Sequence, residues 1–114
     1  MKQPTPDVDE DDVRRVLLRD YPESDFDSIW KAIEAVEVRE KWRVVLACLK
    51  TGGGSTEKLR YQLKDASGYY REIISEAEYP KYTKKMFHIE KLPEAEQQAI
   101  CDQDWKQYEA WLKK

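Results

Sequence analysis

The stretch Lys50-Thr51-Gly52-Gly53-Gly54-Ser55-Thr56 decides the fold, because it holds three of the four glycines of the chain. Before it, Trp42, Val45 and Leu49 recur at the three- and four-residue spacing of an amphipathic helix. After it, Leu59 and Leu63 resume that spacing. The glycines are therefore predicted to separate two helices.

Glycine often closes a helix because it accepts a positive φ without a steric penalty. We therefore expect Gly52 to occupy or adjoin the C-terminal cap of the preceding helix. We expect Gly53 and Gly54 to tolerate alanine better than Gly52, since they would only span the joint.

Apolar spacing and end signals predict further helices on both sides of this joint. The predicted segments are residues 9–20, 25–36, about 38–50, 55–67, 70–79 and 93–112, and residues 81–92 are expected to form an ordered loop. Ser24 with Asp27 resembles a capping box, and Ser55 or Thr56 is the expected N-cap after the glycines. No useful segment alternates with period two, so the prediction is an all-α, compact single-domain array of five to six short helices.

Length and composition set further limits. A chain of 114 residues is long enough for one domain with one core, and 40% apolar residues suit an ordered globule. We expect residues 1–8 to form a flexible arm and residues 9–114 a single helical domain. No apolar run approaches the ~20 residues of a membrane span, and the first residues lack an apolar signal segment. These features indicate a soluble, cytoplasmic protein with no membrane partner.

Enzymatic chemistry has little support in the sequence. His88 is the only histidine, so any Ser-His or Cys-His pair must use it. Cys48 and Cys101 lie in apolar helical patterns and are expected to be buried thiols rather than metal ligands or a disulfide. A group of acidic residues lacks the accompanying Glu-x-x-His pairs of a di-metal site and is read as a solvated face: Glu34, Glu37, Glu40, Glu76 and Glu78. We therefore expect no catalytic residue, metal or cofactor.

Charge is unevenly distributed along the chain. Residues 7–12 contain five acids, whereas residues 81–91 contain Lys81, Lys84, Lys85 and Lys91 against Glu90 alone. Such a layout can steer a charged partner, or it can be ordinary solvated charge. The net charge of −3 makes nucleic acid an unfavoured partner.

Six residues at the two ends of the predicted 70–79 helix have the composition of a protein-binding patch, in which rigid aromatic rings and cations dominate the energetics. They are Tyr69, Tyr70, Arg71, Tyr79, Lys81 and Tyr82. All four rings cannot easily point inward beside Ile73, Ile74 and Ala77. The leading hypothesis is therefore a non-enzymatic protein that binds another protein through this turn, and the alternative is that the rings lie on the core.

A small-ligand or anion site at the glycines is the second functional hypothesis. A nucleotide-binding phosphate loop needs a lysine after its last glycine, and here the lysine precedes them. The free amides of a helix N-terminus can nevertheless hold an anion. The candidate residues are Gly53, Gly54, Ser55, Thr56 and Lys58.

Three segments resemble a group of short bacterial all-helical proteins. They are Leu46-Ala47-Cys48-Leu49-Lys50, Tyr70-Arg71-Glu72 and Ala77-Glu78-Tyr79-Pro80. The resemblance implies a bacterial source and supplies no activity, so no functional residue follows from it.

Overall fold

A computed structural model describes residues 2–114, which form seven α-helices and one 3-10 turn, with no strand in this range. The all-α prediction is confirmed, and five of the helices are at least seven residues long. The elements are α1 (Glu10–Asp20), η1 (Glu23–Asp25), α2 (Phe26–Glu34), α3 (Lys41–Gly52), α4 (Thr56–Glu78), α5 (Pro80–Lys84), α6 (Met86–Ile89) and α7 (Glu94–Leu112).

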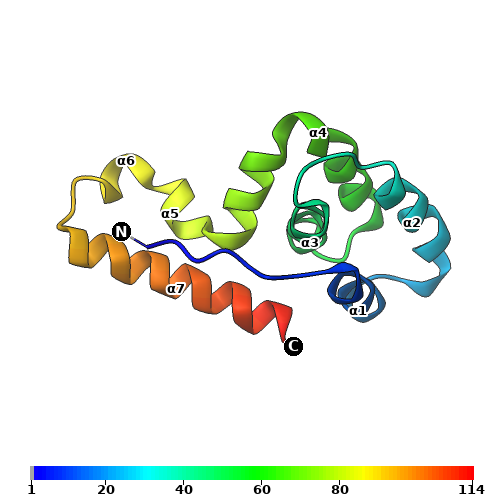
Figure 1. The fold of residues 1–114 in the computed structure, drawn as a ribbon, viewed down its shortest axis with the longest axis horizontal. Helices are drawn as coiled ribbons and strands as arrows, with labels where there is room; N and C mark the ends of the chain where they lie inside the picture. The colour runs from blue at the N-terminus through cyan, green and yellow to red at the C-terminus, as the bar shows by residue number, and fades with distance from the viewer. Residues whose placement is uncertain (1) are drawn as a thin grey trace.

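The larger hydrophobic cluster lies among the first four helices, with α3 at its centre. Val44 to Leu49 are all buried, because α1 and α4 both pack against α3. Figure 1 shows α3 enclosed by α1, α2 and α4 at one end of the molecule. The apolar spacing of the sequence therefore identified the main core correctly.

Helix α4 joins the two ends of the molecule and bends in its middle. Its one non-helical residue is Tyr69, with φ −126° and ψ 23°. The prediction that two helices meet near Gly68 agrees with this bend, because two helical segments join across a kink at Tyr69; the expected positive φ at Gly68 is wrong. The second half of α4 carries the end that contains α5, α6 and α7 (Figure 1).

A second, smaller cluster holds this other end together. Tyr79, Tyr82, Ile89 and Cys101 are its buried members, with Ile100 and Trp105 packed against them. The sequence indicated one core only. The segment 81–92, predicted as a loop, contains α6 and most of α5, which are too short to show a helical period in their apolar residues.

Residues 2–8, predicted as a flexible arm, follow a defined path along α7 (Figure 1). The Lys2 amide donates to Gln98 Oε1 at 2.7 Å, and Gln98 Nε2 donates back to the Lys2 carbonyl at 2.8 Å. The Tyr79 hydroxyl donates to the Pro4 carbonyl. The arm therefore contacts both α7 and the end of α4.

Side-chain caps explain where two of the helices begin. Asp9 and Asp12 form a reciprocal capping box at α1, with amide-to-carboxylate distances of 3.0 and 3.1 Å. Ser55 caps α4 by accepting from the Lys58 amide, as predicted. The capping box expected at Ser24 is wrong, because the η1 turn precedes α2 and α2 has no side-chain cap.

The glycine run is a helix joint, and the prediction that Gly52 adjoins the cap of α3 is confirmed. The reason for glycine differs between the three positions. Gly53 and Gly54 have the positive φ angles, +59° and +86°, whereas Gly52 is the last helical residue. The reason expected for their tolerance of alanine, that they only span the joint, is incomplete, since alanine is strained in left-handed geometry.

Gly53→Ala should lower the free energy of unfolding by about 1–2 kcal/mol, because a Cβ at φ +59° is strained although no atom lies within 4 Å of it. Gly53→Asn should cost less, since asparagine accepts the left-handed region more readily. Urea unfolding of both variants measures the difference. Equal losses would contradict a backbone origin of the effect.

Candidate functional site

The end of the molecule formed by residues 80–92, called here the tip, exposes the most prominent apolar side chain of the described residues. Phe87 is 83% exposed, and Met86 and Leu92 are exposed beside it in the sequence. Large apolar side chains on a surface are unremarkable singly, but a group of them marks a candidate interaction surface. The sequence analysis missed this group, because these residues have no period.

Four exposed lysines accompany these apolar residues: Lys81, Lys84, Lys85 and Lys91. None of them forms an ion pair with any residue in the range 2–114. Glu90 is the only acid within the tip. The tip therefore combines apolar side chains with uncompensated positive charge.

Buried groups hold the tip in place. The Asp104 carboxylate, on α7, accepts from the Tyr82 amide at 2.8 Å and from the Lys81 amide at 3.3 Å. These are the first amides of α5, which would otherwise lack a partner at a helix start. Tyr82 and Ile89 point into the smaller cluster. Because this framework is fixed, Phe87 is presented to solvent on an ordered backbone.

The six residues predicted as a binding patch at the tyrosine-rich turn do not form one exposed surface, because some of them are buried. Tyr79 and Tyr82 are buried in the smaller cluster, so their rings cannot serve an exposed patch in this conformation. Tyr69 is 60% exposed at the bend of α4. Arg71 is exposed and lies 5.7 Å from the ring centre of the half-buried Tyr70. Of the six predicted residues, Lys81 and Tyr82 belong to the tip, and only Lys81 is exposed there.

At the glycine joint, the side chains predicted to bind an anion form hydrogen bonds within the protein instead. Thr56 Oγ1 donates to Asp25 Oδ2 at 2.7 Å, and the Ser55 hydroxyl oxygen accepts from the Lys58 amide at 3.3 Å. Gly54 lies against the Asp20 carbonyl, and Gly53 faces open space. A carboxylate at the start of α4 complements the positive end of its helix dipole. These contacts favour the structural role of the joint over anion binding.

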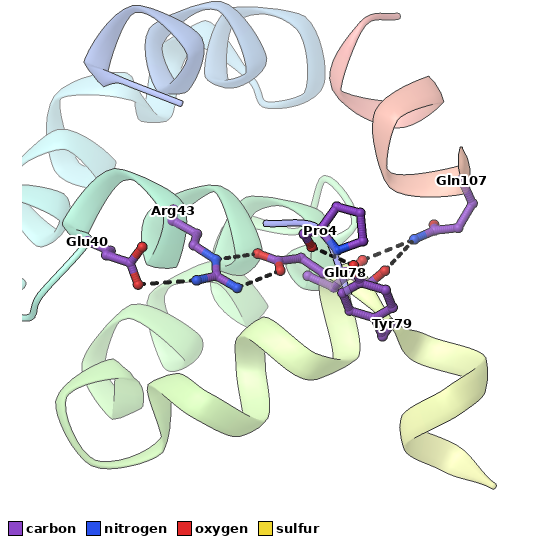
Figure 2. A network of polar contacts seen from close by, with 7 residues as sticks. Pro4, Glu40, Arg43, Glu78, Tyr79 and Gln107 are labelled. Atoms are coloured by element: carbon purple, nitrogen blue, oxygen red, sulfur yellow. Dashed lines mark hydrogen bonds and ion pairs between the residues drawn. The ribbon is translucent and has the colours of Figure 1, made fainter. Parts of the chain in front are cut away.

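A buried ion pair lies between α3 and the end of α4 (Figure 2). Arg43 Nε donates to Glu78 Oε2 at 2.7 Å, and Arg43 Nη2 donates to Glu78 Oε1 at 2.8 Å. This bidentate hydrogen bonding is the main cause that raises the pKa of Arg43. Glu40 adds a third contact at 3.1 Å.

Glu78 corrects the expectation of a solvated acidic face, because its side chain is fully buried. The sequence contained a signal for this, since Glu78 lies four residues after Ile74 and next to Ala77, within the apolar stripe of α4. The nearby Tyr108 hydroxyl is buried without a hydrogen-bond partner in residues 2–114, and burial raises its pKa. Gln107 Nε2 donates to the Ala77 carbonyl at 3.2 Å, which ties α7 to this region.

The side chains that could serve in catalysis, one histidine and two cysteines, do not form a common site. His88 is exposed on the tip, and Cys48 is a buried free thiol whose pKa burial raises to about 12. Cys101 is also buried, and its Sγ accepts from Gln3 Nε2 at 3.6 Å, so the prediction that both cysteines are buried is confirmed. Within residues 2–114, no three His, Cys, Asp or Glu side chains are grouped so that they could hold a metal ion.

None of the described helices combines the length and the apolar character that a membrane-spanning segment requires. Comparison with known proteins finds no family model that matches the chain, and no curated protein or solved structure that is significantly similar to it. The resemblance to short bacterial proteins therefore stays an expectation. The geometry of the tip and of the buried contacts behind it has to support any functional assignment.

Proposed function

We propose that the protein works by binding another protein, and that the tip is its binding surface. The observation that supports this proposal is the exposure of Phe87, at 83%, beside Met86 and Leu92 and among lysines without acidic partners. Binding energy in protein interfaces is concentrated in a few apolar or aromatic anchors with a polar rim. The tip has this composition.

The lysines define the chemistry of the partner. Complementary charge increases the rate of encounter and excludes partners of like charge, so a surface with four free lysines favours an acidic protein. The apolar anchors distinguish this surface from a purely electrostatic nucleic-acid site, and the net charge of −3 disfavours nucleic acid further. A non-enzymatic role in the cytoplasm, without a membrane partner, is part of the same proposal.

Phe87→Ser should weaken binding of the partner about 30-fold, the effect of losing an anchor worth roughly 2 kcal/mol. Phe87 is exposed, so its replacement should leave the circular dichroism and the unfolding midpoint unchanged. The measurement is affinity capture, identification of the captured protein, and titration of that purified protein.

Lys84→Glu combined with Lys85→Glu should slow association with the partner and reduce the dependence of association on salt.

Tyr61→Ser is the matched control, because Tyr61 is also a large exposed side chain, at 69%, but lies on α4 outside the tip. It should bind like the wild type. A partner whose affinity is equal for wild type, Phe87→Ser and the double lysine variant would contradict the proposed surface.

A further inference from the structure

We infer that the surface that receives the tip is the groove between α1 and α2 of a second copy of this chain, so that copies associate head to tail. This inference rests on the proposed function, since it identifies the partner of the same tip. Figure 1 places α6 and α2 at opposite ends of the molecule, whose longest extent is 47 Å. One copy therefore cannot bring its own tip to its own groove.

The groove has an apolar floor and a volume of about 490 Å³. Leu17, Leu18, Phe26 and Trp30 supply its apolar lining. Leu18 is 66% exposed although it neighbours the buried Leu17 on α1. A groove between two helices with exposed apolar side chains in its lining can receive a protruding aromatic side chain.

The wall of the groove is already ordered. The Trp30 ring stacks on Trp42 with 6.3 Å between centroids, and the Arg14 guanidinium lies 4.0 Å from the centre of the Trp30 ring. Glu10 accepts from Arg14 at 3.0 Å and fixes this arrangement. A side chain that enters the groove therefore meets positioned partners, which reduces the entropy cost of binding.

Charge complementarity points to the same pairing. Residues 7–37, which include α1 and α2, contain eleven acids and four bases, whereas the tip contains four lysines and one acid. At the groove itself, the acids Asp27 and Glu34 are balanced by the bases Arg14 and Lys31, so the negative charge comes from the surrounding residues of this region. The opposite net charges of residues 7–37 and of the tip favour contacts between copies in a head-to-tail arrangement.

The contact is heterologous, because the two surfaces differ, and such contacts build rings or open chains rather than closed two-fold dimers. Three apolar side chains and a few lysines make a small interface, so the association should be weak and concentration-dependent. Sedimentation velocity in low salt up to about 1 mM protein covers the range of such weak contacts. The weight-average mass of the wild type should at least double over the titration, and added salt should reduce it by screening.

Two blocked variants test the pairing of the surfaces. Phe87→Ser removes the anchor from the tip, and Leu18→Arg places a cation at the groove that repels the lysines of the tip. Both residues are exposed, so both variants should fold like the wild type. Each variant alone should remain monomeric, whereas an equimolar mixture should form a 1:1 dimer and nothing larger, because one intact tip meets one intact groove.

The control Tyr61→Ser should associate like the wild type. A monomeric wild type throughout the titration, association that persists in either blocked variant, or a mixture that stays monomeric would each overturn the head-to-tail contact. If the wild type is monomeric but a different acidic protein binds through Phe87, the proposed function stands and this inference fails. If Phe87→Ser changes neither self-association nor binding of another protein, the proposed function and the head-to-tail inference both fail.

Discussion

Methionine in place of Arg43 should lower the free energy of unfolding by about 3–5 kcal/mol, because Glu78 would be left with a buried charge and no partner. The Glu78 side chain is fully buried and receives two hydrogen bonds from the Arg43 guanidinium, at 2.7 and 2.8 Å. Urea unfolding with an unchanged slope would measure the loss as a shift of the midpoint.

Two further variants test whether the loss of stability comes from the unpaired buried charge of Glu78. Arg43→Met combined with Glu78→Leu should recover most of the loss, since an apolar pair of similar volume often replaces a buried ion pair at little cost. Glu40→Ala should cost less than about 1 kcal/mol, because the Glu40 side chain is 63% exposed and its contact with Arg43 is screened by water. A loss below about 1 kcal/mol in Arg43→Met itself would contradict the expectation.

Gly52→Ala should be the second severe substitution, with a loss of about 3 kcal/mol, at the upper end of the usual cost of overpacking a core. An added Cβ would collide with the Tyr21 hydroxyl and lie 3.2 Å from Leu59 Cβ. The Tyr21 hydroxyl cannot move freely, because it donates to the Leu49 carbonyl at 2.7 Å inside the core. The urea midpoint again provides the measurement.

Gly68→Ala is the matched control, and it should raise the free energy of unfolding where Gly52→Ala lowers it. Gly68 lies inside α4 without a positive φ, and nothing lies within 4 Å of a Cβ placed there. Alanine should therefore stabilise the helix by about 0.5–1 kcal/mol. Tyr21→Phe in the Gly52→Ala background should recover part of the loss by removing the colliding oxygen. Equal effects at Gly52 and Gly68 would mean that steric contact does not explain the requirement for glycine.

Local signals explain the parts of the fold that the sequence predicts well. The Ser55 cap and the end of α1 before Pro22 depend on a few neighbouring residues, and the core face of α3 depends on its apolar period. Gly68 indicated the interruption correctly to within one residue, because the two segments of α4 meet at a kink on Tyr69, but Gly68 itself has no positive φ. The tip was predicted as a loop because helices of four or five residues contain too few apolar positions to reveal a period.

The candidate surface was harder to predict than the fold, because burial at a helix end depends on distant partners. Tyr79 and Tyr82 follow α4 and could face either side until α7 is in place, and it is α7 that supplies Cys101, Trp105 and Asp104 around them. The exposure of Phe87 also depends on tertiary structure, since no other part of residues 2–114 covers its side chain. Tertiary contacts of this kind leave little trace in the spacing of a single sequence.

The path of the N-terminal arm has a consequence for synthesis on the ribosome. Lys2 reaches its partner Gln98 across 96 positions of the chain, so the arm cannot dock until α7 has been synthesised. The main cluster of α1–α4 can form earlier, because its buried members all precede residue 78, and only Trp111 and Leu112 of α7 are added to it later. Vectorial synthesis therefore favours an order in which the α1–α4 end folds first and the arm docks along α7 only after α7 has been made.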